Sequence, residues 1–508
     1  MKRILYILLA VILLSTVAVP PAGALVGYEP SITDGKDYKE MVFLSGKPVL
    51  YSGEVKATSK LKEDVMQTTL TYKLTSSVSS DTLTRTIKMD SKITKNGSQE
   101  VYDTKITNLT ETVQAGGNKL KLKKDGYFFS ASKVIDHRPV IDFFTENWYF
   151  KRIYELGKGK NYISVVTSGT TDGYSSAWGA GTTGTMNTNL ESVAGDSTGS
   201  AWKGTVQGTM LASTTHDLRY IPSAPQLISY SGGYVEESAG EESLRISYDM
   251  PTVGASSSAT STTSTTTTTS TTSATTINDT IRNTGTTTTS VNSPPTQKRL
   301  FIREYKDVRG HWAQNSIEAM SGLGVFDNTG NFFGPGLMAR REDLARGLSM
   351  LCNLVQEGPV KKTALTKKAV PEQPYFVDVQ PDDQYYKYVQ EIQKRNIVVG
   401  ITEKTFRPHE PLTRAEAATA LITALGLNRL APTPGFKTSF ADDSEIPNWA
   451  KDSVYVANEL GIIKGDSGFF RPNDTMTRAE LAVILDGFRT YLSRDFKKDY
   501  ADHVYSFK

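Results

Sequence analysis

Cysteine, histidine and long apolar runs are scarce in this sequence. The only cysteine among the 508 residues is Cys352, which excludes an intramolecular disulfide framework and a cysteine-rich zinc site. The five histidines all lie more than four positions apart, so the paired histidines of helical zinc motifs are absent as well. The 57 Lys and Arg nearly balance the 54 Asp and Glu, which gives no reason to expect nucleic-acid binding. We therefore expect neither a metal nor another cofactor.

Only the first residues contain a long apolar run, and they resemble a secretory signal peptide. Two basic residues precede the run at 4–14, and an Ala-Gly-Ala sequence at 22–24 offers a cleavage site. The run is shorter than the roughly 20 residues that a membrane-spanning helix needs. We predict a signal peptide over 1–24, a secreted mature chain and no contact with a membrane after cleavage.

Residues 25–251 are predicted to form a mainly antiparallel β domain of unknown role. Apolar side chains alternate with Thr and Lys, as in the stretch 66–75, and this alternation is typical of strands with one buried and one solvated face. Turn dipeptides such as Asn-Gly at 96–97 separate the runs. An aromatic cluster at 143–150 interrupts the alternation. We expect it to be a short helix that covers the sheet or a ligand surface, burial being the commoner fate.

Residues 252–297 are predicted to be a disordered linker. From 252 to 296, 29 of the 45 residues are Ser or Thr, and large apolar side chains are almost absent. Such a segment buries too little surface to offset the entropy of ordering it. We expect an extended spacer between two independent domains, either unmodified or O-glycosylated.

Beyond the linker the apolar period becomes helical, and three related copies follow at 298–360, 371–430 and 436–495. Each copy carries an Asp, then a Phe-x-Pro loop, then the start of a helix. The distance from the Asp to an Arg of that helix start is 33, 36 and 36 residues. Repeats of this length usually pack against one another to share a core.

The helix starts of the second and third copies read Thr-Arg-Ala-Glu. Thr413 and Thr477 are predicted N-caps, and Glu416 and Glu480 would complete capping boxes at the third helical position. In the first copy Ala339 falls at the cap position. We therefore expect that helix start to be under-capped.

Capping does not explain the arginine that follows each cap position. These arginines are Arg340, Arg414 and Arg478. The helix dipole disfavours a cation at a helix start, whereas a guanidinium there suits an anion such as a carboxylate, so we favour anion binding over mere solvation of these side chains. We also expect the side chains of Arg414 and Arg478 to be exposed and to contribute little to stability.

In the order and spacing of these elements, the region from about 300 to 490 resembles the S-layer homology (SLH) family of bacterial cell-surface proteins. The resemblance implies a mainly α-helical pseudo-trimer whose grooves bind secondary cell wall polysaccharide, often through a pyruvylated amino sugar. It also implies that the arginines face the ligand carboxylate, that Asp residues lie near sugar hydroxyls and that Trp residues wall the groove. The implied ligand-binding residues are Asp307, Trp312, Arg340, Asp378, Arg414, Asp442, Trp449 and Arg478. In the second copy Gln384 lies near the place of the tryptophan, and Tyr385 is the expected substitute.

The resulting prediction is a multidomain, non-catalytic protein secreted to the cell wall or S-layer. Its C-terminal SLH triplet would bind wall polysaccharide on the peptidoglycan-associated surface, with neither nucleic acid nor membrane as a partner. Its β domain would be displayed from that anchor.

Two alternatives place an activity in residues 25–251. The first is a wall-anchored, polysaccharide-active enzyme, although no spacing singles out a catalytic pair or triad. Its candidate residues are Glu146, Asp172, Glu191 and Asp249, or the neighbouring Ser213, His216 and Asp217. The second alternative is a carbohydrate-binding adhesin that uses Trp178 or Trp202.

Overall fold

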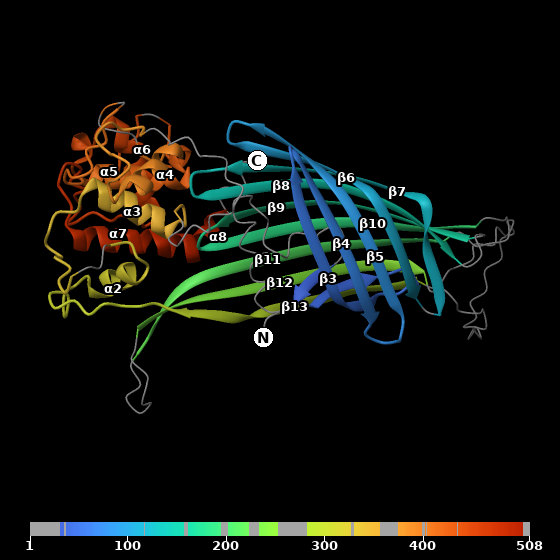
Figure 1. Cartoon of the computed structure of the whole chain (residues 1–508). Coiled ribbons are helices and arrows are strands. Elements are labelled where there is room, and N and C mark those ends of the chain that lie inside the picture. The colour runs from blue at the N-terminus through green and yellow to red at the C-terminus, as the bar shows by residue number, and fades with distance from the viewer. Residues whose placement is uncertain are drawn as a thin grey trace, which may run out of the picture.

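A single large sheet and a cluster of short helices make up this computed structural model (Figure 1). It describes residues 31–34, 37–115, 117–156, 161–194, 202–222, 233–251, 282–326, 330–355, 374–398, 402, 404–433 and 435–500. The predicted signal peptide and residues 252–281 of the predicted linker lie outside the described residues.

The sheet has 13 strands in the order β1 to β13, and each strand pairs antiparallel with the next along the chain. This topology confirms the predicted antiparallel β domain. The strands are β1 (Ser31–Asp34), β2 (Asp37–Val42), β3 (Val49–Lys62), β4 (Val65–Ser76), β5 (Thr82–Asn96), β6 (Gln99–Ala115), β7 (Asn118–His137), β8 (Ile141–Leu156), β9 (Asn161–Ser176), β10 (Gly179–Ala194), β11 (Lys203–Ile221), β12 (Gly233–Pro251) and β13 (Arg282–Arg299).

The sheet curls so that β1 comes close to β12 and β13, and its inner face surrounds a core of its own. In β4, Leu70, Tyr72 and Leu74 are buried on that face while Lys73 between them is exposed, as period-two alternation predicts. The core also holds an ion pair. Arg85 donates to both carboxylate oxygens of Glu40, each at 2.9 Å.

The aromatic cluster at 143–150 lies within β8, so the predicted short helix is wrong. Trp148 and Phe150 point into the sheet core and are buried there, as expected for large apolar side chains. Phe143 faces outward and stacks on Tyr500 near the C-terminus, with ring centroids 5.8 Å apart. Alternation therefore continues through the cluster, with a second apolar layer outside the sheet.

The predicted linker is also wrong for residues 282–297, because they belong to β13. This strand pairs with β12 from Arg282, opposite Pro251, to Arg299, opposite Val235. Threonine has a high strand propensity, and the backbone of β12 supplies hydrogen-bond partners that a low-hydrophobicity segment can use without burying large side chains. The Thr-rich segment thus ends inside the β domain rather than between two domains.

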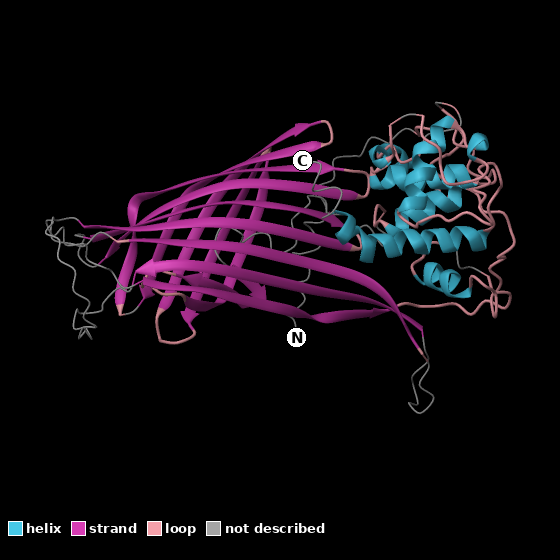
Figure 2. Cartoon of the chain, turned by 180° about the vertical axis from the view of Figure 1, so that it is seen from behind, coloured by secondary structure: helices cyan, strands magenta, loops and turns pink. Residues whose placement is uncertain are grey.

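The helical region follows β13 and contains short α-helices in pairs (Figure 2). Its elements are α2 (Gln314–Gly322), α3 (Arg341–Leu351), α4 (Tyr386–Lys394), α5 (Arg414–Leu425), η2 (Asn428–Leu430), η3 (Asp443–Glu445), α6 (Asn448–Glu459), α7 (Arg478–Thr490), η4 (Tyr491–Asp495) and α8 (Phe496–Asp499). Among the described residues, no helix is both long enough and apolar enough to cross a membrane.

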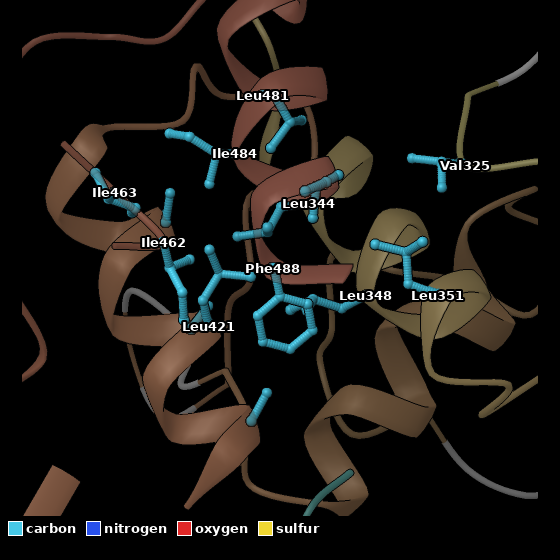
Figure 3. Packing of buried hydrophobic residues seen from close by; sticks show 14 of the residues in the cluster. Val325, Leu344, Leu348, Leu351, Leu421, Ile462, Ile463, Leu481, Ile484 and Phe488 are labelled. Atoms are coloured by element: carbon cyan, nitrogen blue, oxygen red, sulfur yellow. The ribbon is translucent and has the colours of Figure 1, made fainter. Parts of the chain in front are cut away.

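Three of these helices, α3, α5 and α7, meet in the middle of one core. Leu348, Leu421 and Phe488, one from each helix, lie close together there and are fully buried (Figure 3). The approach of α3 to α7 requires a glycine, since a Cβ on Gly347 would lie 2.6 Å from a methyl carbon of Leu485. The three helices therefore form one folding unit rather than separate modules.

The sheet packs against the C-terminal ends of these three helices. Trp178 donates its indole N–H to the Leu351 carbonyl at the end of α3, at 2.7 Å. Asp217 accepts from Arg494, just beyond α7, at 2.6 Å. The core cluster of the helices also includes buried side chains of the sheet, among them Tyr174. The two parts are thus joined by a buried interface, and the N-terminal ends of α3, α5 and α7 point away from the sheet.

This interface predicts that cutting the chain between β12 and β13 will not separate its parts. A recognition sequence for a site-specific protease can be inserted after Thr266. After cleavage, we expect the two fragments to elute together from a native sizing column, because β13 stays paired with β12 and the sheet stays docked on the helices. In urea they should elute separately. Separate elution under native conditions would contradict the docked arrangement.

Candidate functional site

The three helical copies are joined at their helix starts by a closed ring of backbone hydrogen bonds. Ala339 N–H donates to Met476 O at 2.8 Å, Met476 N–H to Leu412 O at 2.9 Å, and Leu412 N–H to Ala339 O at 2.8 Å. All three side chains are at most 1% exposed. We call these residues the axis ring, because they surround the pseudo-threefold axis that relates the copies.

The axis ring corrects the alignment of the first copy by one position. Leu412 and Met476 directly precede the N-caps of α5 and α7, and Ala339 directly precedes Arg340, which is the N-cap of α3. Ala339 is therefore not the cap. The residue of α3 that matches Arg414 and Arg478 is Arg341, not Arg340.

A signal for this alignment is present in the sequence. The Phe of each Phe-x-Pro loop lies eight positions before the arginine in all three copies when Arg341 is chosen. The distance from the Asp is 34 residues in the first copy, because the segment between the Asp and the loop is shorter there. Spacing from the loop would have identified Arg341, whereas spacing from the Asp did not.

The predicted capping boxes are confirmed in α5 and α7. Thr413 Oγ1 accepts from the Glu416 amide at 3.3 Å, and Glu416 Oε2 accepts from the Thr413 amide at 2.9 Å. Thr477 and Glu480 repeat this arrangement. In α3 the acid is one methylene shorter, and Asp343 Oδ2 accepts from the Arg340 amide at 2.9 Å.

Each of the three equivalent arginines reaches into the next copy around the axis. We call Arg341, Arg414 and Arg478 the arginine ring. Arg341 donates its Nε–H to the Phe406 carbonyl at 2.8 Å, and its guanidinium lies 4.8 Å from the centre of the Phe406 ring. Arg414 does the same with Phe470, at 2.7 Å and 5.3 Å. Arg478 lies 4.8 Å from the Phe333 ring and so returns to the first copy.

The arginine ring also meets the capping acids of the neighbouring copies. Arg341 is hydrogen-bonded to Glu416, and Arg478 lies 3.7 Å from Asp343. Burial lowers the pKa of Arg341, although the charge of Glu416 works in the opposite direction. The side chain of Arg341 is 5% exposed. That of Arg478 is 20% exposed and Arg414 is half-buried, so the exposure predicted for Arg414 and Arg478 is wrong.

The helix starts themselves are not open to an anion. In α5 the amide of Arg414 donates to Asp474 O at 3.1 Å, and that of Ala415 donates to Pro472 O at 3.0 Å. The amide of Glu416, the next residue of the helix, donates to the Thr413 hydroxyl. Loops of the neighbouring copies bind α3 and α7 in the same way. The geometry therefore does not support an anion held by these amides.

The three predicted aspartates hold the Phe-x-Pro loops of their own copies. Asp307 accepts from the amides of Phe333 at 2.8 Å and Gly334 at 2.7 Å. Asp442 accepts from Phe470 and Arg471 at 2.8 and 2.6 Å, and Asp378 makes the matching contacts. Burial opposes ionisation of Asp307, but its backbone amide donors outweigh burial and lower its pKa.

These bonds fix an unusual backbone conformation in each loop. Gly334, Arg407 and Arg471 all have left-handed φ values, of 71°, 56° and 56°. A residue other than glycine is strained in this backbone conformation. Asp378 and Asp442 therefore stabilise Arg407 and Arg471, respectively, in a conformation that these arginines would rarely adopt alone. The side chains of Arg407 and Arg471 remain about half exposed.

The two predicted tryptophans are exposed at equivalent positions. Trp312 is 68% exposed and Trp449 is 57% exposed, and each precedes a buried alanine at the start of the first helix of its copy. In the second copy Tyr385 takes the place of that alanine and is 8% exposed, so it does not substitute for the tryptophan. The exposed Gln384 occupies the tryptophan position.

The alternative site residues of the β domain are not brought together. Glu146 shares the inner face with Trp148, whereas Asp172 is on the outer face. Glu191 is paired with Lys203 at 3.3 Å, and Asp249 with Arg282 at 2.6 Å. His216 and Asp217 alternate across the sheet, and Ser213 accepts from Lys497 at 3.2 Å. Trp178 is buried at the helical interface, and Trp202 packs against the sheet core.

The corrected alignment predicts opposite effects for two neighbouring threonine substitutions. Arg340→Thr should add a cap hydroxyl to α3 and stabilise the protein by roughly 0.5–1 kcal/mol. Ala339→Thr should cost roughly 1–3 kcal/mol, because it forces a hydroxyl and a methyl group into the buried axis ring. Urea unfolding followed by the helical signal would measure both. A stabilising Ala339→Thr with a neutral Arg340→Thr would restore the alignment drawn from the Asp spacing.

Comparison with known proteins agrees with this architecture. The profile of the S-layer homology domain matches residues 304–345, 375–418 and 439–482. Exoglucanase XynX of Acetivibrio thermocellus is 28% identical over 191 residues, which cover 36% of this chain and 16% of the enzyme. The surface-layer 125 kDa protein of Lysinibacillus sphaericus is 28% identical over 197 residues, 38% of this chain and 15% of that protein. S-layer protein sap of Bacillus anthracis is 29% identical over 177 residues, 34% of this chain and 20% of that protein.

The chain therefore spans at most a fifth of the length of these three relatives, which include both surface-layer proteins and an enzyme. The matches confirm the predicted recognition of three S-layer homology domains at the C-terminus. These domains indicate a secreted protein attached to the cell wall at the cell surface.

Proposed function

We propose that this chain, which carries three S-layer homology domains, is a non-catalytic surface protein whose helical triplet binds secondary cell wall polysaccharide. The exposure of Trp312 and Trp449 carries this proposal. An indole that is largely exposed to water contributes little to the fold. Its presence at the same position in two copies is therefore best explained by a bound ligand.

Tryptophan suits a sugar polymer. Its flat apolar ring can pack against the C–H face of a sugar, and its N–H can donate to a hydroxyl. Gln384 offers the second copy only hydrogen bonds at this position, so we propose that the first and third copies contribute most of the affinity.

The cation for an acidic sugar would come from different arginines than those predicted. The arginine ring is engaged with carbonyls, rings and capping acids, so we assign it to positioning. Arg407 and Arg471 are half exposed on loops that the aspartates fix, and their donors pair with Glu410 at 3.2 Å and Asp466 at 3.0 Å. Surface ion pairs of this kind exchange readily for a ligand carboxylate.

The docking of the sheet supports a display role for the β domain. The sheet covers the C-terminal ends of α3, α5 and α7, while the axis ring lies at the other end of the same helices. A polymer bound at the axis-ring end of the triplet would therefore leave the sheet domain uncovered. The engagement of the candidate carboxylates in ion pairs or on opposite faces favours display over catalysis.

The proposal predicts that Trp312→Ala combined with Trp449→Ala will weaken binding to purified wall polysaccharide at least about tenfold. The free energy of unfolding should change by less than about 1 kcal/mol, because both rings are largely solvated. Calorimetric titration of the full chain would measure the binding. Leu61→Ala with Leu211→Ala, which removes two exposed apolar side chains from the sheet, is the matched control. Binding equal to wild type in the tryptophan variant would contradict the assignment.

A further inference from the structure

The near-neutral charge of the whole chain hides an asymmetry within the β domain. Residues 49–137, which contain β3 to β7, carry 14 Lys and Arg against 10 Asp and Glu. Residues 138–251, which contain β8 to β12, carry 8 against 12. The helical triplet docks on the second, acidic part through Asp217, so the basic part is left uncovered by that interface.

The basic charge is concentrated on the outer face of β3, β4 and β5. In these strands the alternate residues Leu70, Leu74 and Ile87 point into the core, so the residues between them point outward. The outward positions carry six exposed lysines: Lys56, Lys60, Lys62, Lys73, Lys88 and Lys92. We call these six lysines the basic face.

Few acids lie on the same three strands as the basic face, and on the adjoining strand Asp103 of β6 lies opposite Lys92. Two carboxylates, Glu54 and Asp90, are on the outward positions of β3 to β5. The pair of Glu54 with Lys56 spans 3.6 Å, and both side chains are more than 60% exposed, so it adds little stability and is easily broken. The face therefore holds a net charge of about +4 on three strands, and like charges side by side on a sheet cost stability unless an anion compensates them.

The lysines are spread out rather than converging on one point. Lys62 and Lys92 lie opposite the same residue of β4, Val65, and are thus two strands apart, about 10 Å. Such spacing matches repeated charges along an extended polymer better than it matches a single small anion.

Aromatic rings lie on the same outer surface of the sheet, beyond β6. Phe128 of β7 is 58% exposed and Tyr149 of β8 is 38% exposed, with ring centroids 6.0 Å apart. Both point outward, since Phe129 and Phe150 beside them are buried in the core. Exposed rings on the same outer surface as the lysines favour a polymer that contains sugars over one made of charge alone.

We propose that the basic face is a second wall-binding surface, which docks an anionic glycopolymer carrying carboxylate or phosphate groups. This inference rests on the proposed function, because attachment of the triplet would hold the sheet at high effective concentration near such polymers. The triplet would then attach the protein to the wall, and the basic face would bind the sheet to anionic polymers of the same wall.

The test measures binding of the full chain to purified anionic wall glycopolymer at several salt concentrations. Lys88→Gln with Lys92→Gln should bind roughly tenfold more weakly at low salt, and the slope of log affinity against log salt should fall by about two. Lys203→Gln with Lys298→Gln removes the same charge from β11 and β13, away from the basic face, and should leave both quantities unchanged. All four side chains are exposed, so folding should be preserved.

The outcomes separate this inference from the proposed function. If the basic-face variant binds like wild type while the tryptophan variant loses binding, the basic face has no such role and the triplet does. If only the basic-face variant loses binding, the face binds the polymer and the triplet proposal fails. Equal weakening by both pairs of lysine substitutions would overturn the inference. Binding of polyphosphate as tightly as the glycopolymer would also overturn it, because the surface would then select charge alone.

Discussion

The closed cycle in which each arginine completes the neighbouring copy is the constraint on which the helical triplet depends. An aspartate holds each loop in a left-handed conformation, and the loop carbonyls of Phe406 and Phe470 accept from the arginines of the preceding copies. At the third junction Arg478 instead lies over the Phe333 ring and 3.7 Å from Asp343. The arginine of the first copy also covers the loop phenylalanine and meets the capping acid of the next helix. Loop, cap and helix start therefore stabilise one another across each junction, and no copy has a complete helix start alone.

This cycle explains how a small helical region can serve as an anchor. The buried core of α3, α5 and α7 and the ring of backbone bonds at their starts fix the three copies rigidly. The sheet then closes the opposite ends of the helices through Trp178 and Asp217. What remains accessible is the outer surface of the copies, with the exposed tryptophans, and the outer surface of the sheet, with its lysines.

Local signals were predictable from the sequence, and long-range ones were not. Capping boxes at Thr413 and Thr477 depend on residues three positions apart, and alternation in the strands depends on residues two apart. The partner of Trp178 lies 173 residues away, so nothing near it in the sequence indicated an interface. Arg341 was not predicted because the first copy has a shorter segment between its aspartate and its loop, which shifts the spacing from the aspartate to the arginine. The strand β13 was not predicted because a Thr-rich strand can be ordered by hydrogen bonds to the backbone of its neighbour rather than by burial of apolar side chains.

The most direct test of the cycle compares two adjacent arginines of the first copy. Arg341 is buried in the junction with the second copy, whereas the side chain of Arg340 is 54% exposed. In urea unfolding followed by the helical signal, Arg341→Met should lower the free energy of unfolding by roughly 2–4 kcal/mol, because it leaves Glu416 and the Phe406 carbonyl without their shared donor. Arg340→Met should lower it by less than about 1 kcal/mol. Equal effects of the two substitutions, or a larger effect at Arg340, would contradict the account.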